Sequence, residues 1–317
     1  MQLKYSVAKH VFTAMLSLGR TEDLKFCPSN RRLAMAAYNK NKIVLFEISL
    51  NNSSGHKKIT LTDATEFSSA CFAAPHGLDF IDDRTMIVAN RDGDACILRL
   101  PPNEDWGPRE LDPIKVIPAS EVLDRPGSVC VVQKGKNSYE ALICNNYQNY
   151  VTRHLINFVD GCAVEKSEVL LRKGLAVPDG VCISKDMQWI AISNHDTQCV
   201  TLYENTGSLN EQSEPVGFLR GANYPHGLRF TSDGNFILVA DAGSPFVHIY
   251  AKGSSWQGAH NPLTSLRVMS EEAFLHGRHN AQEGGPKGID IDKTSEVIVT
   301  TCESQPLAFF ELSKILT

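Results

Sequence analysis

A short phrase that returns along the chain constrains its fold more than any other feature. It reads Pro-His-Gly-Leu-Asp-Phe at Pro75–Phe80 and Pro-His-Gly-Leu-Arg-Phe at Pro225–Phe230. Looser copies complete a set of six at intervals of about fifty residues; they begin at Thr21, Pro126, Pro178 and Pro286. A repeat of this length is typical of the blades of a β-propeller.

Each copy has the pattern of a four-stranded antiparallel sheet. In the fifth copy the opening strand is followed by a Ser-Asp-Gly-Asn turn and by the apolar runs Phe236–Asp241 and Phe246–Tyr250. Such runs, rich in β-branched and aromatic residues and bounded by turn residues, indicate strands. An outer strand is expected before each new phrase, for example at Lys57–Leu61 and Val169–Leu171. The sequence therefore predicts an all-β, six-bladed β-propeller that occupies residues 1–317 as one domain.

The last copy lies too close to the end of the chain to supply its own outer strand. We expect a segment within Leu3–Leu16 to pair there and to close the ring. Helical periodicity is nearly absent, and the one helix expected runs from Ser270 to His276 with Ser270 as its N-cap. That helix falls in the longest stretch between blades, Ser254–Gly285, which we expect to cover one face of the propeller as a lid.

Composition and charge argue against several classes of function. The net charge is −5, and no basic run is present, so a nucleic-acid partner is not expected. No apolar run approaches the length of a membrane span, and no signal peptide is evident, which favours a cytoplasmic protein without a membrane partner. The nine cysteines include no C-x-x-C pair and suit free thiols in a reducing compartment.

Two segments carry a family resemblance. Pro225–Gly243 and Pro178–Asp196 resemble the blade consensus of NHL-repeat proteins and of the senescence-marker-protein/gluconolactonase family. The resemblance covers all six copies, and it implies a divalent metal in the central channel. The implied ligands occupy the position before the glycine of the phrase, which here holds Glu22, His76, Gly127, Asp179, His226 and Lys287.

These six positions also carry chemistry of their own, because the first strand of each propeller blade lines the channel. Imidazoles and carboxylates at Glu22, His76, Asp179 and His226 would suit Zn, Fe, Mn or Ca as ligands. A metal-free alternative uses His76 or His226 as a general base, oriented by Asp179 or Glu22. Lys287 is expected to stabilise a developing anion. A solvated channel lining without function is the remaining alternative.

The turns after the second strands should lie on the same face as this ring. Most of their residues are Asn, Asp and Gly, which hairpin geometry alone explains. Larger polar side chains in these turns could contact a ligand at the mouth of the channel. We predict substrate contacts from Arg91, Tyr147, His195 and Asp241.

Two functions of different classes follow from these observations. The first is a gluconolactonase-like, metal-dependent hydrolase or lyase that acts on a small, polar, lactone-like substrate at the channel mouth. The second is a non-catalytic binding module that holds a protein or a small molecule. Phosphoryl transfer and nucleophile-elbow hydrolysis are not expected, because the sequence contains neither a phosphate-binding loop nor a G-x-S-x-G motif.

Overall fold

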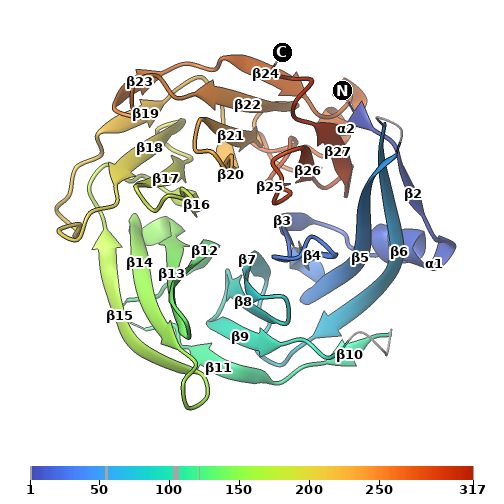
Figure 1. Cartoon of the computed structure of the whole chain (residues 1–317), viewed down its shortest axis with the longest axis horizontal. Helices are drawn as coiled ribbons and strands as arrows, with labels where there is room; N and C mark the ends of the chain where they lie inside the picture. The colour runs from blue at the N-terminus through green and yellow to red at the C-terminus, as the bar shows by residue number, and fades with distance from the viewer. Residues whose placement is uncertain (1, 54–55, 103–106, 121, 317) are drawn as a thin grey trace.

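Six β-sheets stand in a ring around a central channel in the computed structural model (Figure 1). The structure describes residues 2–53, 56–102, 107–120 and 122–316. The predicted all-β, six-bladed propeller with four-stranded antiparallel blades is confirmed. No helix within these ranges is long and apolar enough to cross a lipid bilayer.

Each blade is built from successive strands, and the first strand lies at the channel. From the channel outward the blades are β3 (Thr21–Phe26), β4 (Arg32–Ala37), β5 (Lys42–Ser53), β6 (His56–Ser68); β7 (Pro75–Asp82), β8 (Thr85–Asn90), β9 (Ala95–Arg99), β11 (Pro113–Ile117); β12 (Pro126–Gly135), β13 (Ser138–Asn145), β14 (Tyr150–Asn157), β15 (Ala163–Leu171); β16 (Pro178–Ile183), β17 (Trp189–Asn194), β18 (Cys199–Glu204), β19 (Gly217–Leu219); β20 (Pro225–Phe230), β21 (Phe236–Asp241), β22 (Phe246–Ala251), β24 (Thr264–Arg267); and β25 (Gly288–Ile291), β26 (Val297–Thr301), β27 (Ala308–Glu311), β1 (Gln2–Leu3). The opening strands thus begin at, or within two residues of, the predicted repeat starts. Two 3₁₀ turns, η1 (Tyr38–Lys40) and η2 (Asn146–Gln148), follow β4 and β13.

The ring is closed by the N-terminus, as predicted, but by a shorter piece than expected. Strand β1 pairs antiparallel with β27, with Leu3 opposite Phe309. Most of the predicted Leu3–Leu16 segment does not pair with the last blade. Strand β2 (Tyr5–Val7) pairs parallel with β6, and α1 (Lys9–Leu16) is a helix. Helix α1 packs Val11 and Met15 into the core of the first blade. The helix has eight residues and buries a single i, i+4 pair, a weak helical signal that explains why α1 was not predicted.

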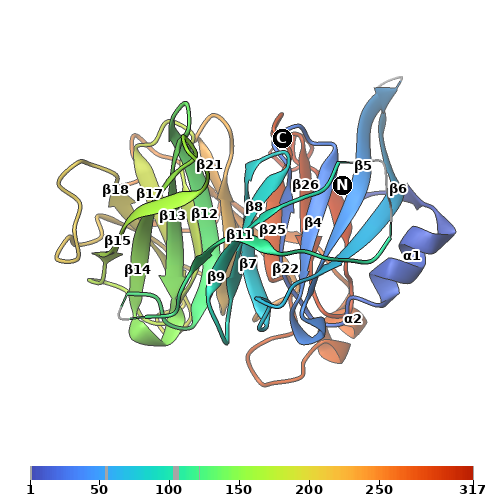
Figure 2. The ribbon, with the colours of Figure 1, turned by 90° about the horizontal axis from the view of Figure 1, so that it is seen from below.

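The Ser254–Gly285 segment divides into two parts with different roles. Its first half extends the propeller, because β23 (Gly258–His260) pairs parallel with β19 and β24 forms the outer strand of the fifth blade. The lid expectation is therefore wrong for this half. The predicted helix is present as α2 (Glu271–His276), and the Ser270 side chain accepts a hydrogen bond from the Ala273 amide. In side view, α2 lies at the face opposite the point where β5 ends (Figure 2).

The glycine of the repeated phrase is required by the approach of the next blade. A Cβ at Gly77 would collide with the Gly127 carbonyl oxygen, and one at Gly180 with the His226 carbonyl oxygen. The backbones of adjacent first strands pass too closely there for any side chain. Blade packing therefore accounts for the glycine, and the residue before it is free to carry chemistry.

Two rings of side chains line the channel. The upper ring is the set of positions before the glycine, namely Glu22, His76, Gly127, Asp179, His226 and Lys287. The lower ring lies three residues further along each strand, at Lys25, Asp79, Cys130, Cys182, Arg229 and Asp290. In the lower ring, carboxylates fasten one blade to the next: Asp79 accepts a hydrogen bond from the Val131 amide at 2.7 Å, and Asp290 from the Phe26 amide at 2.8 Å.

Candidate functional site

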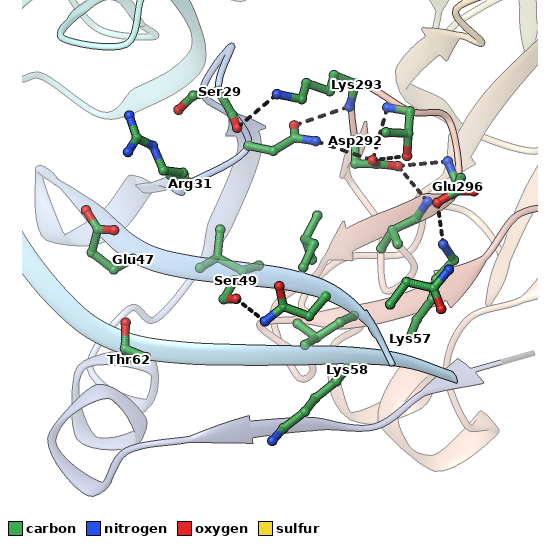
Figure 3. A pocket seen from close by; sticks show the side chains of 18 residues that line it. Ser29, Arg31, Glu47, Ser49, Lys57, Lys58, Thr62, Asp292, Lys293 and Glu296 are labelled. Carbon is green, nitrogen blue, oxygen red and sulfur yellow. Dashed lines mark hydrogen bonds and ion pairs between the residues drawn. The ribbon is translucent and has the colours of Figure 1, made fainter. Parts of the chain in front are cut away.

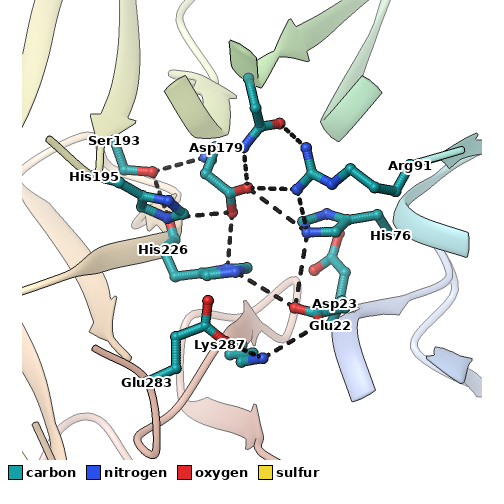
Figure 4. A network of polar contacts seen from close by, with 12 residues as sticks. Glu22, Asp23, His76, Arg91, Asp179, Ser193, His195, His226, Glu283 and Lys287 are labelled. Carbon is teal, nitrogen blue, oxygen red and sulfur yellow. Dashed lines mark hydrogen bonds and ion pairs between the residues drawn. The ribbon is translucent and has the colours of Figure 1, made fainter. Parts of the chain in front are cut away.

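The structure brings the four predicted ligands of the upper ring together. Glu22, His76, Asp179 and His226 come from the first strands of four blades, and each is at most 4% exposed (Figure 4). Above them opens a cavity of about 420 Å³, lined by His76, Asp179 and His226 and by side chains of the turns. A buried polar cluster at the floor of a cavity is the arrangement expected of a ligand site.

His226 lies between two carboxylates. Its Nδ1 is 3.0 Å from Asp179 Oδ2, and its Nε2 is 3.5 Å from Glu22 Oε2. Burial by itself lowers the pKa of His226, but Asp179 and Glu22 outweigh burial and raise it. Without another cation, the two carboxylates therefore favour the protonated form of His226.

His76 is held neutral by Arg91. The Arg91 Nη2 lies 2.6 Å from His76 Nε2 and 3.1 Å from Asp179 Oδ1. Burial, and then the Arg91 charge, lower the pKa of His76 well below its usual value. The Nε2 lone pair accepts from Arg91, so that a ligand or base role for His76 requires Arg91 to move away.

Asn146 completes the site in the third blade, where the upper ring has only Gly127. Its Nδ2 donates to Asp179 Oδ1 at 2.7 Å, and its Oδ1 accepts from Arg91 Nη1. The sequence prediction chose Tyr147 in this turn and missed Asn146. Aligning the turns would have found it, because Asn146 holds the same position after the second strand as Arg91 and His195.

Lys287 is occupied by three carboxylates. Its Nζ lies 3.2 Å from Glu22 Oε1, 2.7 Å from Glu283 Oε2 and 3.2 Å from Glu303 Oε1. The side chain is 1% exposed, and an ammonium has three protons to donate. This engagement favours a buried counter-charge over the predicted role of anion stabiliser.

The second half of the lid segment reaches this site. Glu283 lines the cavity and also binds Arg20 at 3.3 Å, and Arg20 in turn contacts Glu22. His279, from the same loop, lies 2.8 Å from Glu303. The prediction of a lid is thus retained for the stretch around Glu283, which sequence analysis had not placed at the site.

Two of the predicted substrate contacts, His195 and Tyr147, lie at the cavity in different environments. His195 is buried, stacks on Tyr224 with 3.9 Å between ring centroids, and places Nε2 3.8 Å from Asp179 Oδ2. Burial lowers the pKa of His195 to about 4. Tyr147 is 63% exposed at the rim of the cavity, where the Arg125 guanidinium lies 5.5 Å from its ring.

Asp241 differs from the other predicted contacts, because it is part of the blade rather than of the cavity. Its buried carboxylate accepts from the Asn223 and Tyr224 amides at 3.0 and 2.7 Å, and also bonds to Ser244 and His248. Both carboxylate oxygens of Asp241 are therefore hydrogen-bonded within the fifth blade. The prediction that Asp241 contacts substrate is corrected to a structural role at the end of β21.

A divalent cation fits one part of this cluster best. Two groups of three residues place ligand atoms within 4.8 Å of one another: Glu22, His76 and His226, and Asp179, His195 and His226. Within the described part of the chain, Asp179 Oδ2 and His195 Nε2 are buried without a hydrogen-bond partner, as is Glu22 Oε2. Because Arg91 engages His76, the Asp179–His195–His226 group is the better donor set, and its nitrogens favour Zn, Fe or Mn over Ca.

A second cavity, of about 470 Å³, lies between the β5–β6 hairpin and the turn before β26 (Figure 3). Its lining has no His, Cys or Tyr among the residues that the structure describes. Lys57 pairs with Glu296 at 2.5 Å, and Lys293 donates to the Ser29 carbonyl oxygen at 3.3 Å. Asp292 is occupied by the Glu296 and Val297 amides. This cavity offers no group suited to the chemistry of the upper ring.

Comparison with known proteins supports the fold. No protein-family model matches the chain, and no curated protein matches it. A functionally unknown protein from Desulfotomaculum acetoxidans is 13% identical, with a TM-score of 0.58 over 92% of this chain and 83% of that one. Candidate 6-phosphogluconolactonases from Bacteroides uniformis and Bacteroides fragilis are 12% and 11% identical, with TM-scores of 0.55 and 0.54 over 91% and 92% of this chain and 80% and 79% of theirs. At this identity the likeness shows a shared fold and nothing of function.

Proposed function

We propose that this protein is a hydrolase of small, polar, lactone-like esters, and that it acts at the mouth of the channel with a divalent cation. Asp179, His195 and His226 would hold the cation. The observation that carries the proposal is the convergence of buried Asp179 Oδ2 and His195 Nε2, neither of which makes a hydrogen bond to a described residue, beside His226, whose Nδ1 lies 3.0 Å from Asp179 Oδ2. The names of the two Bacteroides neighbours support a lactone as the substrate class.

When bound, a cation of this kind would polarise the ester carbonyl and lower the pKa of a coordinated water. Arg91 and Asn146 donate to Asp179 Oδ1 and so orient Oδ2 toward the histidines, as residues that hydrogen-bond to metal ligands do. Burial raises the pKa of Glu22, but Lys287, His226 and nearby cations outweigh burial and hold the pKa well below its usual value. Glu22 is therefore an ionised carboxylate of low basicity, able to accept a hydrogen bond at the floor of the site.

The test is metal content and lactone hydrolysis, measured on the same preparations. Untagged protein purified without chelator is analysed by elemental mass spectrometry, and hydrolysis of simple lactones is followed by acid release. The wild type and an exposed-histidine control, His276→Ala, should contain near-stoichiometric metal, whereas His226→Ala and Asp179→Asn should lose both metal and activity. A metal-free wild type whose melting temperature does not change when divalent ions are added would overturn the proposal and favour the binding-module alternative.

A further inference from the structure

Two cysteines of the second blade lie in contact outside the channel site. Cys71 is in the loop between β6 and β7, and Cys96 is the second residue of β9. Both are free thiols, and their Sγ atoms are 2.6 Å apart. A disulfide bond measures about 2.05 Å, so a small movement of one side chain would join the two sulfurs.

The two sulfurs differ in access and in acidity. Cys71 is half-buried, and Cys96 is buried. Hydrogen bonds between Cys71 and the side chains of Cys96 and Ser69 help lower the pKa of Cys71 to about 7, while the contact with Cys71 and burial raise the pKa of Cys96 above its usual value. Near neutral pH the accessible sulfur is thus the nucleophile, and the buried sulfur keeps its proton.

We propose that Cys71 and Cys96 are a thiol modification site that forms a reversible disulfide by exchange with a small-molecule disulfide such as oxidised glutathione. The Cys71 thiolate attacks one glutathione sulfur, the glutathione S–S bond breaks, and one glutathione thiolate leaves. Cys96 then attacks Cys71 Sγ, and its proton passes to the second departing glutathione. The protein dithiol is oxidised by two electrons, and one oxidised glutathione becomes two reduced molecules.

The thiol pair is linked to the channel site through Asn90 and Arg91. Cys96 Sγ accepts from Asn90 Nδ2 at 3.4 Å, and Asn90 Oδ1 accepts from the Ala73 amide at 3.2 Å. The Arg91 amide donates to the Ala74 carbonyl oxygen at 2.9 Å. A disulfide would therefore restrain the loop that positions Arg91, the residue that orients His76 and Asp179. A consequence for catalysis rests on the proposed function, whereas the disulfide itself does not.

The chemistry is tested by equilibrating the full chain in buffers of graded glutathione ratio, alkylating the remaining thiols after denaturation, and mapping peptides by mass spectrometry. In wild-type protein, two alkylation sites should disappear together and a peptide linking Cys71 to Cys96 should appear. The matched control Cys199→Ser, at another half-buried cysteine, should behave identically. Cys96→Ser should stop at a glutathione adduct on Cys71, with Cys96→Ala as a second variant if serine impairs folding.

Wild-type protein that keeps every thiol alkylatable, or that accumulates a stable glutathione adduct on Cys71 while Cys96 stays free, would overturn the proposal. The link to Arg91 is read by hydrogen exchange, since the disulfide should slow exchange of the Arg91 amide. Identical exchange in the oxidised and reduced proteins would refute that link. Neither measurement depends on metal content or lactone hydrolysis, so failure here is distinguishable from failure of the proposed function.

Discussion

The two polar rings of the channel come from the same six strands, yet they differ in which buried polar atoms lack a hydrogen-bond partner. In the lower ring, Asp290 accepts from the Arg229 side chain at 2.9 Å and from the Phe26 amide of the next blade. The lower ring's unpartnered atom is a donor, Arg229 Nη2, which lies 3.7 Å from Asp23. In the upper ring, the buried atoms without a hydrogen bond to the described residues are Glu22 Oε2 and Asp179 Oδ2. His195 Nε2, in the turn beside the ring, is a third.

This difference shows that a convergence of ionisable side chains does not by itself mark a site. Both rings are buried and charged, and both follow from the repeat. What separates them is the cavity above the upper ring and the lone pairs that face one another beside His226. The lower ring uses its carboxylates to join blades, whereas in the upper ring Glu22 Oε2 and Asp179 Oδ2 are buried without a hydrogen bond from the part of the chain that the structure describes.

The largest effect should come from breaking the lower ring. Asp290→Asn removes the carboxylate that accepts from buried Arg229 at 2.9 Å and leaves Asp23, 3.7 Å away, as the remaining counter-charge. We expect the free energy of unfolding to fall by about 3 kcal/mol, the lower end of the cost of breaking a buried ion pair. Urea denaturation would measure it, and the exposed control Asp112→Asn should change the value by less than about 0.5 kcal/mol. A loss below about 1 kcal/mol would show that this ring is not a structural fastening.

A smaller effect, on binding rather than folding, should come from Arg91→Ala. Arg91 donates to Asp179 Oδ1 and orients this carboxylate. Removing such a donor to a metal ligand should weaken metal affinity by about 10–100-fold. Competition with a chromophoric chelator gives the affinity, and Arg84→Ala, in the same blade but exposed, should retain it. Equal affinity in the two variants would separate Arg91 from the proposed metal ligands.

The pH dependence of metal binding should distinguish the rings further. His226 must lose its proton to bind a cation, so affinity should rise by about tenfold per pH unit below its folded pKa and level off above it. Because Asp179 and Glu22 raise that pKa, the rising limb should extend above the ordinary value of about 6.5. In the metal-free protein, the stability that His226 contributes is full below pH of about 6.5 and is lost as pH rises through the folded pKa. An affinity that does not change between pH 6 and 7 would contradict this assignment.

The smallest effect on stability should come from the rim. Tyr147→Ala should change the free energy of unfolding by less than about 0.5 kcal/mol and leave metal content unchanged, since the side chain is largely exposed. If Tyr147 contacts substrate, KM for the lactone should rise with little change in kcat. An unchanged KM would show that Tyr147 does not contact the substrate.

Part of the site was predictable because the repeat makes positions equivalent. Glu22, His76, Asp179 and His226 occupy one position of the phrase, so a six-fold arrangement had to bring them to one axis. Arg91 and His195 were predicted from their turns, and their contacts with Asp179 are now visible. The partners of each ligand were not predictable, because hydrogen bonds such as Arg91 to His76 depend on side-chain direction across blade boundaries.

The sequence by itself determined the number of blades, the start of each first strand and the face on which the upper ring lies. Those features follow from local patterns: strand periodicity, turn residues and, in four of the six copies, a glycine where adjacent first strands approach closely. Only the tertiary structure decided that Asp241 is used within its blade, that Lys287 is enclosed by three carboxylates and that Glu283 enters the cavity. These outcomes depend on which groups distant in sequence satisfy one another when buried, and a single strand does not encode that.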